Sequence, residues 1–369
     1  MVCSTAILSS SLALSLLRYS APPSQSFVLS PFSLNTVLSI VHDGSGGNTQ
    51  KELTDLLLKG CSPIDVTNFY SNLALSLPST KERKVAIKSA NRFYVDQSIS
   101  LKNDYQKHVE GKYNVKVENI NLSDKVEAAK EMNSFVDRTT NGKIKEIVED
   151  IAENTQAKAY LINALHLHGN WEKSFMKELT KKRPFKGHNG ERDVSVTNFK
   201  ESKYRFRLTS CIKLIIFEPI LDDKFKFFFL MPNETSSLGE MREELNGQKL
   251  IKTINDVSNM RARISVPKIK VESAMDGKEV LSKMGVNSIF SDDADFSKIS
   301  SSPLHVSKIT QKVVLETNEE GTEAAAVTFV EMWATSQRGA KPPPLIVIDR
   351  PFLFGILRGD DILFIGQFV

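Results

Sequence analysis

The chain ends in three short apolar runs, and these limit the folds open to it more than any other feature. Residues 345–348, 352–357 and 362–369 are each too short for a typical helix. Gly359, Asp360 and Asp361 precede the last run and are typical of a hairpin turn. Continuous apolar runs of this length predict buried strands. The C-terminal part of the chain is therefore expected inside a β-structure.

Elsewhere, helical patterns come first and strand patterns follow. Before residue 150, apolar residues at helical spacing predict helices over residues 8–17, 49–58 and 126–136. Ser30-Pro31 is typical of the start of another helix. Residues 85–94 predict a strand. The later runs predict strands, interrupted by one short helix at 276–284; they are residues 159–167, 211–217, 226–231, 261–271 with a break at Pro267, and 304–316. This order predicts the α+β class, and we expect one domain over residues 1–369.

Composition restricts the class of protein further. The net charge of +4, without a basic stripe, does not indicate a nucleic-acid partner. There is no stretch of about 20 apolar residues that could span a membrane. The first residues lack a base before the apolar run, so an amphipathic helix is favoured over a signal peptide. Cys3, Cys61 and Cys211 are interpreted as free thiols, which together with the unfavoured signal peptide favours a cytoplasmic location; export without a cleaved leader is the alternative. We expect a monomer.

Three local patterns suggest chemistry, and each has a plainer interpretation. Ser45 lies in the Gly-rich segment DGSGG, but the order of residues does not match a protease nucleophile loop, so a connection between helices is favoured. His166 and His168 share one side of a strand, yet no third zinc ligand is near in sequence. We therefore expect no catalytic residue, metal or cofactor.

The third pattern is the basic cluster formed by Lys81, Arg83 and Lys84. A cluster of this kind could contact a sulfated polysaccharide or another anion. A solvated face beside a strand is the favoured interpretation.

Seven segments, in order along the chain, resemble one protein family. They are FVLSPFS at 27–33, TNGKI at 140–144, NALHLHGNW at 163–171, VPKI at 266–269, ADFS at 294–297, NEEGTEAAA at 318–326 and IDRPFLF at 348–354. Together they resemble the serpins over essentially the whole chain. The resemblance implies a fold of three β-sheets with about nine helices and an exposed reactive loop at about residues 319–343.

Membership would also imply a mechanism. A serine protease, or a cysteine protease in some cases, cuts the exposed loop and forms an acyl-enzyme. The loop then enters the central sheet as a new strand, which drags and distorts the protease before it can be released. A non-inhibitory member with a binding or chaperone-like role is the alternative.

The hinge of the loop favours the inhibitory type. Alternate side chains of an inserted strand enter a packed interior. One face of this segment holds only small or β-branched side chains, namely Thr322, Ala324, Ala326, Thr328 and Val330. A charge or a proline on that face would oppose insertion, and neither is present. By resemblance the hinge comprises Glu319, Gly321, Thr322, Glu323, Ala324, Ala325 and Ala326.

The resemblance also places residues where the sheet must open. Ser30, Ser33 and Asn163 would form a polar cluster beneath the opening, and Trp171 would lie where the loop first enters. Gln311 falls where many members carry a histidine. A glutamine can form hydrogen bonds there, but it cannot titrate near neutral pH.

The cleaved bond is left open by two conflicting counts. Fourteen residues after the hinge glycine gives Thr335, cut before Ser336. Counting back from the C-terminal motif makes the loop about five residues longer than usual. Arg338, cut before Gly339, would suit a trypsin-like pocket and is the alternative.

Overall fold

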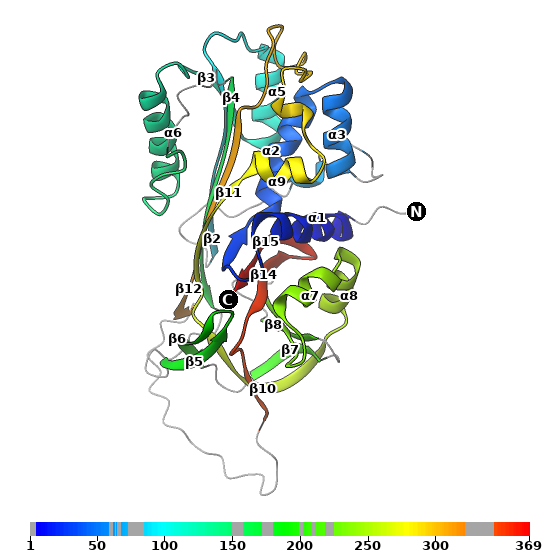
Figure 1. The fold of residues 1–369 in the computed structure, drawn as a ribbon, viewed down its shortest axis with the longest axis vertical. Helices are drawn as coiled ribbons and strands as arrows, with labels where there is room; N and C mark the ends of the chain where they lie inside the picture. The colour runs from blue at the N-terminus through cyan, green and yellow to red at the C-terminus, as the bar shows by residue number, and fades with distance from the viewer. Residues whose placement is uncertain are drawn as a thin grey trace, which may run out of the picture.

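The computed structural model describes residues 5–58, 62, 64, 68–72, 85–149, 158–171, 180–198, 202–208, 212–217, 225–321 and 343–369 (Figure 1). Its helices are α1 (Thr5–Ser20), α2 (Pro31–Gly44), α3 (Gly47–Leu57), α5 (Asn103–Tyr113), α6 (Lys125–Thr139), α7 (Leu238–Glu244), α8 (Gly247–Asn255), α9 (Gly277–Lys283) and the 3-10 helix η2 (Ser288–Phe290). Its strands are β1 (Phe27–Leu29), β2 (Val85–Asp96), β3 (Lys116–Ile120), β4 (Ala159–Trp171), β5 (Lys181–Gly187), β6 (Gly190–Asn198), β7 (Ser202–Leu208), β8 (Ile212–Phe217), β9 (Phe225–Pro232), β10 (Ser258–Pro267), β11 (Lys270–Asp276), β12 (Lys308–Gly321), β13 (Leu345–Val347), β14 (Phe352–Arg358) and β15 (Asp361–Phe368).

Local sequence explains several element boundaries. The hydroxyl of Ser30 accepts a hydrogen bond from the Ser33 amide, and Pro31 follows it, so α2 begins as the sequence predicts. Pro267 ends β10, which separates it from β11. The strand predicted from residue 304 begins only at Lys308. The Val306 amide instead donates to the Ile289 carbonyl, which holds this segment outside the ladder.

A five-stranded sheet in the order β11-β12-β4-β2-β3 forms the centre of the molecule. Helix α6 covers one face and α2 lies against the other (Figure 1). On the α6 side, Ile162 and Ala164 of β4 pack against Met132 and Val136. The side chains that alternate with them, such as Leu161 and Leu165, belong to the large core on the opposite side. Both faces of the central strands are therefore buried.

The remaining strands form two sheets joined through β10. The first part of β10 pairs with β7, within the order β1-β15-β14-β9-β8-β7. Its second part pairs with β6 and β13, and β6 pairs with β5. The predicted α+β fold with three sheets is confirmed. Among the described residues, no helix has both the length and the apolar character needed to cross a bilayer.

The C-terminal strands are buried as predicted. Every residue from Phe352 to Leu357 is buried, and so is every residue from Ile362 onward. Aromatic rings of β14 stack against β9, since the Phe227 and Phe354 rings lie 6.1 Å apart and nearly parallel. The hairpin between β14 and β15 turns at Gly359, whose φ of 61° suits glycine.

The half-buried carboxyl group at the start of β15 makes stability depend on pH. Burial raises the pKa of Asp361 from 3.8 to about 6, and Asp360 adds to the rise. Between these values the folded protein keeps a proton that the unfolded chain releases, so stability falls as pH rises through this range. We expect Asp361→Asn to raise the free energy of unfolding by about 1 kcal/mol at pH 7, and the gain to vanish below about pH 4. Urea unfolding at several pH values measures this.

Asp360→Asn provides the matched control, because it removes the same charge from an exposed neighbour. Asp360→Asn should raise the free energy of unfolding at pH 7 by less than Asp361→Asn does. An equal gain from both variants would show that net charge, and not the burial of Asp361, sets the effect.

Candidate functional site

The structure describes the two ends of the predicted loop. Glu319 and Gly321 lie in the last part of β12, and the chain is described again from Pro343. Residues 322–342 lie outside the described residues, so the predicted hinge positions from Thr322 to Ala326, both candidate bonds (Thr335-Ser336 and Arg338-Gly339) and the length of the loop stay predictions.

The strand that leads into the loop runs parallel to its neighbour β4. Backbone partners continue from Lys308 and Tyr160 to Thr317 and Gly169. Any segment that followed β12 and turned back between these strands would run antiparallel to both. It would also form a hydrogen-bonded ladder on each side. In the present structure β4 and β12 are direct neighbours, so the sheet is closed.

The pairing becomes irregular just before the loop. Thr317 lies opposite Gly169, whereas Gly321 lies opposite Trp171. Four steps along β12 thus correspond to two along β4, which is the pattern of a bulge. This places the predicted entry residue Trp171 opposite the last residue of β12.

A row of amides crosses the closed strands, with Asn163 and Gln311 buried and Asn91 half-buried. Asn91 of β2 lies opposite Asn163 of β4, which lies opposite Gln311 of β12. The Asn163 amide donates at 2.5 Å to the Asn91 side-chain oxygen and at 2.5 Å to the Ser33 hydroxyl. The Gln311 amide donates to the Asn163 side-chain oxygen. We call Asn91, Asn163 and Gln311 the amide row.

The amide row is tied to the start of α2. Gln311 accepts a hydrogen bond from the Ser30 amide at 2.9 Å and donates to the Ser30 carbonyl at 3.0 Å. Ser30, Ser33 and Asn163 are fully buried, and Gln311 is 1% exposed. A buried polar group that loses its partner costs about 1–3 kcal/mol, so these contacts oppose separation of β4 from β12.

Four of the five predicted sheet-opening residues therefore meet at one place. Trp171 does not join them, because it lies eight residues beyond Asn163 on β4, about 26 Å along an extended strand. Asn91 was missed by sequence analysis. Asn91, Phe93 and Val95 are two residues apart on one strand, so they share a face, and the other two are apolar and buried. A polar residue on such a face needs a hydrogen-bond partner, and this pattern could have identified Asn91.

The other end of α2 is fixed by a charged cluster. Asp43 accepts hydrogen bonds from Tyr113 at 2.9 Å and from Lys112 at 3.1 Å, and His108 lies 2.9 Å away. Burial acts to raise the pKa of Asp43, but contacts with His42, His108 and Lys112 outweigh it and hold that pKa well below its usual range. The pKa of Tyr113 shifts the other way: burial raises it, and the nearby negative charge of Asp43 adds to the rise. Helix α2 is thus anchored to α5 at one end and to the amide row at the other.

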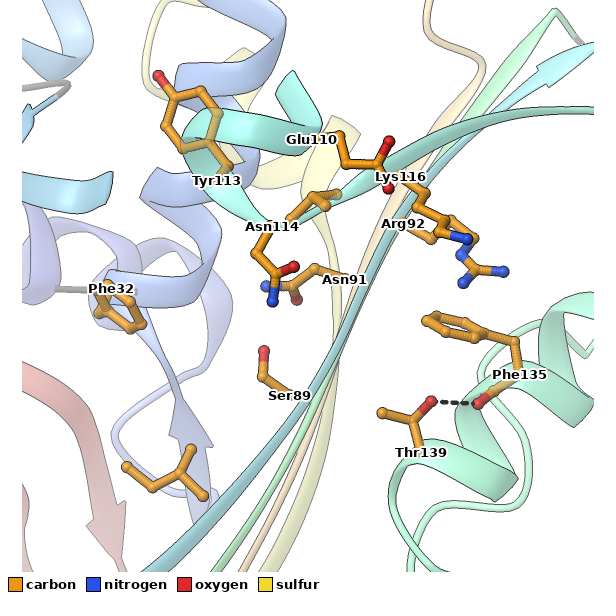
Figure 2. A pocket seen from close by; sticks show the side chains of 12 residues that line it. Phe32, Ser89, Asn91, Arg92, Glu110, Tyr113, Asn114, Lys116, Phe135 and Thr139 are labelled. Atoms are coloured by element: carbon orange, nitrogen blue, oxygen red, sulfur yellow. Dashed lines mark hydrogen bonds between the residues drawn. The ribbon is translucent and has the colours of Figure 1, made fainter. Parts of the chain in front are cut away.

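A cavity of about 330 Å³ lies at the edge of β2 and reaches the amide row (Figure 2). Asn91 and Ser89 line its centre, with Phe32 on one side and Phe135 on the other. The Arg92 guanidinium lies 3.7 Å from the centre of the Phe135 ring and 2.8 Å from Glu118. The cavity is therefore walled by both polar and aromatic groups beside the strand that carries Asn91.

The two alternative chemical sites are not supported. Ser45 is fully buried and donates to the His42 carbonyl at 2.8 Å, so its hydroxyl terminates α2 and is not placed to attack a substrate. His166 is 5% exposed on β4, and the side chain of His168 is not among those that the structure describes. No group of three or more metal-ligating side chains was found in the part of the chain that the structure describes.

Comparison with known proteins agrees with this geometry. The family model "Serpin (serine protease inhibitor)" matches residues 8–369. Serpin B6 from Pongo abelii is 29% identical over 354 residues, which cover 94% of this chain and 93% of that protein. Serine protease inhibitor 42Dd from Drosophila melanogaster is 30% identical over 353 residues, covering 94% and 91%.

Solved structures lead to the same family. The crystal structure of Serpin48 from the insect Tenebrio molitor, described as a highly specific serpin, superposes with a TM-score of 0.83 at 27% identity. The match covers 98% of this chain and 96% of that one. With the family model matching nearly the whole sequence, the chain belongs to the serpin family.

Proposed function

We propose that this serpin is a suicide inhibitor of proteases that acts by inserting its cleaved loop between β4 and β12. One observation carries the proposal. The two strands are parallel and adjacent, and the chain leaves β12 directly into a segment whose alternate side chains are small or β-branched. Such a segment can enter the sheet without burying a charge. The target is a serine protease, or a cysteine protease as the alternative.

Insertion would replace one ladder with two. Parting β4 and β12 breaks the hydrogen bonds between them, and an inserted strand pairs with both. The closed protein would therefore be metastable, with a more stable state available once cleavage frees one end of the loop. This gain is the source of the force that distorts the bound protease.

The amide row would control this opening. Asn163 and Gln311 lie on the two strands that must part, so their mutual hydrogen bond must break. Either the bonds from Gln311 to Ser30 or the bond from Asn163 to Ser33 must break with it, because α2 is tied to both strands. These groups are neutral amides and hydroxyls, so the barrier that they set does not titrate near neutral pH. A histidine at position 311 would have made it pH-dependent.

Thr335 is proposed as the residue before the cleaved bond, and Arg338 as the alternative. A cut near Thr335 leaves a shorter tether, which transmits more distortion to the protease. A cut after Arg338 suits a trypsin-like pocket. Cytoplasmic location, the monomeric state and polyanion binding at Lys81, Arg83 and Lys84 remain proposals that rest on sequence alone.

Incubation with trypsin, chymotrypsin, elastase and papain tests the function. We expect at least one of them to form a complex that survives SDS, with release of a C-terminal peptide. The N-terminus of that peptide identifies the bond: Ser336 if Thr335 is the bait, Gly339 if Arg338 is. Cleavage by all four proteases without any such complex would favour the binding or chaperone-like alternative.

A charge on the inserting face should turn the inhibitor into a substrate. Thr322→Arg would bury an unpaired charge at a cost of about 3–5 kcal/mol, which slows insertion by roughly a hundredfold or more. The protease would then be released before it is trapped. The yield of complex per cleaved loop measures this, with Glu323→Arg on the opposite face as the matched control. Equal yields from both variants would contradict the assigned face.

Loss of Gln311 should weaken the closed sheet. Gln311→Leu leaves the Ser30 amide and carbonyl and the Asn163 oxygen without their partner, so we expect a loss of about 2–4 kcal/mol and faster conversion to the inserted state. Thermal unfolding and the rate of spontaneous inactivation measure it. Thr310→Val is the control, because the buried Thr310 hydroxyl has no hydrogen-bond partner among the described residues. If both variants unfold alike, the amide row does not hold the sheet closed.

A further inference from the structure

Asparagine is followed by glycine at three places in the chain, namely Asn141-Gly142, Asn189-Gly190 and Asn246-Gly247. Such a pair can react with itself, because glycine has no side chain to shield its backbone nitrogen. That nitrogen gives up its proton and bonds to the side-chain carbonyl carbon of the asparagine, and the side-chain amide leaves as ammonia. Water then opens the resulting succinimide ring to give aspartate or isoaspartate. The fold decides which of the three pairs can reach this geometry.

The pair at Asn246 is fixed at both groups that would react. The side-chain oxygen of Asn246 caps α8 by accepting a hydrogen bond from the Lys249 amide at 2.9 Å. Gly247 is buried so tightly against α1 that an added Cβ would lie 2.5 Å from the Ile7 carbonyl oxygen. The side-chain carbonyl and the glycine nitrogen therefore cannot approach each other unless the start of α8 unfolds.

The pair at Asn141 is fixed at the attacking atom. The Gly142 nitrogen donates a hydrogen bond to the Asp137 carbonyl of α6 at 2.8 Å. The Thr140 hydroxyl, just before the pair, accepts a hydrogen bond from the Ile144 amide at 3.0 Å, which fixes the chain on both sides. Attack at Asn141 thus requires the end of α6 to open first.

The pair at Asn189 is held much less firmly. It lies in the turn between β5 and β6, near the lower end of the molecule in Figure 1, and His188, Asn189 and Gly190 are all exposed. Gly187 lies opposite Gly190, so the turn closes the last pair of the ladder, and end pairs open more readily than inner ones. No described atom lies within 4 Å of the place that a Cβ of Gly190 would take.

The side chain of Asn189 is also free to turn. It forms no hydrogen bond to any other residue that the structure describes, in contrast to the capping side chain of Asn246. Its carbonyl carbon can therefore rotate towards the Gly190 nitrogen at little cost, since only water has to be displaced.

We propose that Asn189 is the deamidation site of the folded protein, and that the fold protects Asn141 and Asn246. The reaction needs no partner other than water. It would convert a neutral turn into one that carries a negative charge directly before Glu191.

The isoaspartate product would also change the hairpin. It adds one carbon atom to the main chain inside a turn of two residues. Strand β5 holds the segment that follows residues 322–342, because the Lys186 amide donates to the Asp349 carbonyl at 2.8 Å. Isoaspartate at position 189 would therefore loosen the strand close to this bond.

Ageing of the folded protein in mildly alkaline buffer tests the proposal. Samples are digested at acid pH, where deamidation is slow, and the peptides that carry each pair are followed by mass spectrometry. We expect Asn189 to be lost about tenfold faster than Asn141 or Asn246, or more, because those two must first break a hydrogen bond. An equal or faster loss at either of them would overturn the proposal, and so would an unchanged Asn189.

The same ageing in urea provides the control for local sequence. All three pairs have the same two residues, so their rates should become similar once the chain is unfolded. A preference for Asn189 that persists in urea would show that the fold does not set it, which would also overturn the proposal.

The Asn189→Asp variant separates the added charge from the lengthened chain. It carries the charge without the extra carbon atom, so aged wild-type protein rich in isoaspartate should melt at a lower temperature than this variant. The Asn189→Gln variant should show no loss at position 189 and should keep its melting temperature during ageing. Equal melting temperatures of the aged protein and Asn189→Asp would contradict the effect on the hairpin.

Discussion

The pairing of β4 with β12 is the interaction on which the rest of this structure depends. The two strands are parallel and adjacent at the centre of the five-stranded sheet, and both their faces are buried. Separating them costs a ladder of backbone hydrogen bonds and the contacts of Gln311 with Asn163 and Ser30. Under the proposed function, the segment that follows β12 would fill the gap between the two strands and pair with both.

Helix α2 connects this pairing with the upper half of the molecule. Its first turn meets the amide row, and its last turn is fixed through Asp43 to Tyr113 and Lys112 of α5. The cavity in Figure 2 lies between these elements and exposes Asn91 at the edge of β2. Movement of α2 or of α5 would therefore shift the amide groups that hydrogen-bond the central strands to one another.

The amide row is held by hydrogen bonds between neutral groups, which salt and pH hardly affect. Under the proposed function, the opening of the sheet would therefore depend little on either.

The sequence by itself determined the elements whose patterns are strong and local. The buried strands β14 and β15, the start of α2 at Ser30-Pro31 and the family all followed from contiguous residues, because periodicity and turn chemistry act over short distances. Resemblance also brought together Ser30, Ser33, Asn163 and Gln311. Only the tertiary structure added Asn91. Its place in the row depends on which residue of a distant strand lies opposite, and a shift of one residue in that register would turn its side chain to the other face.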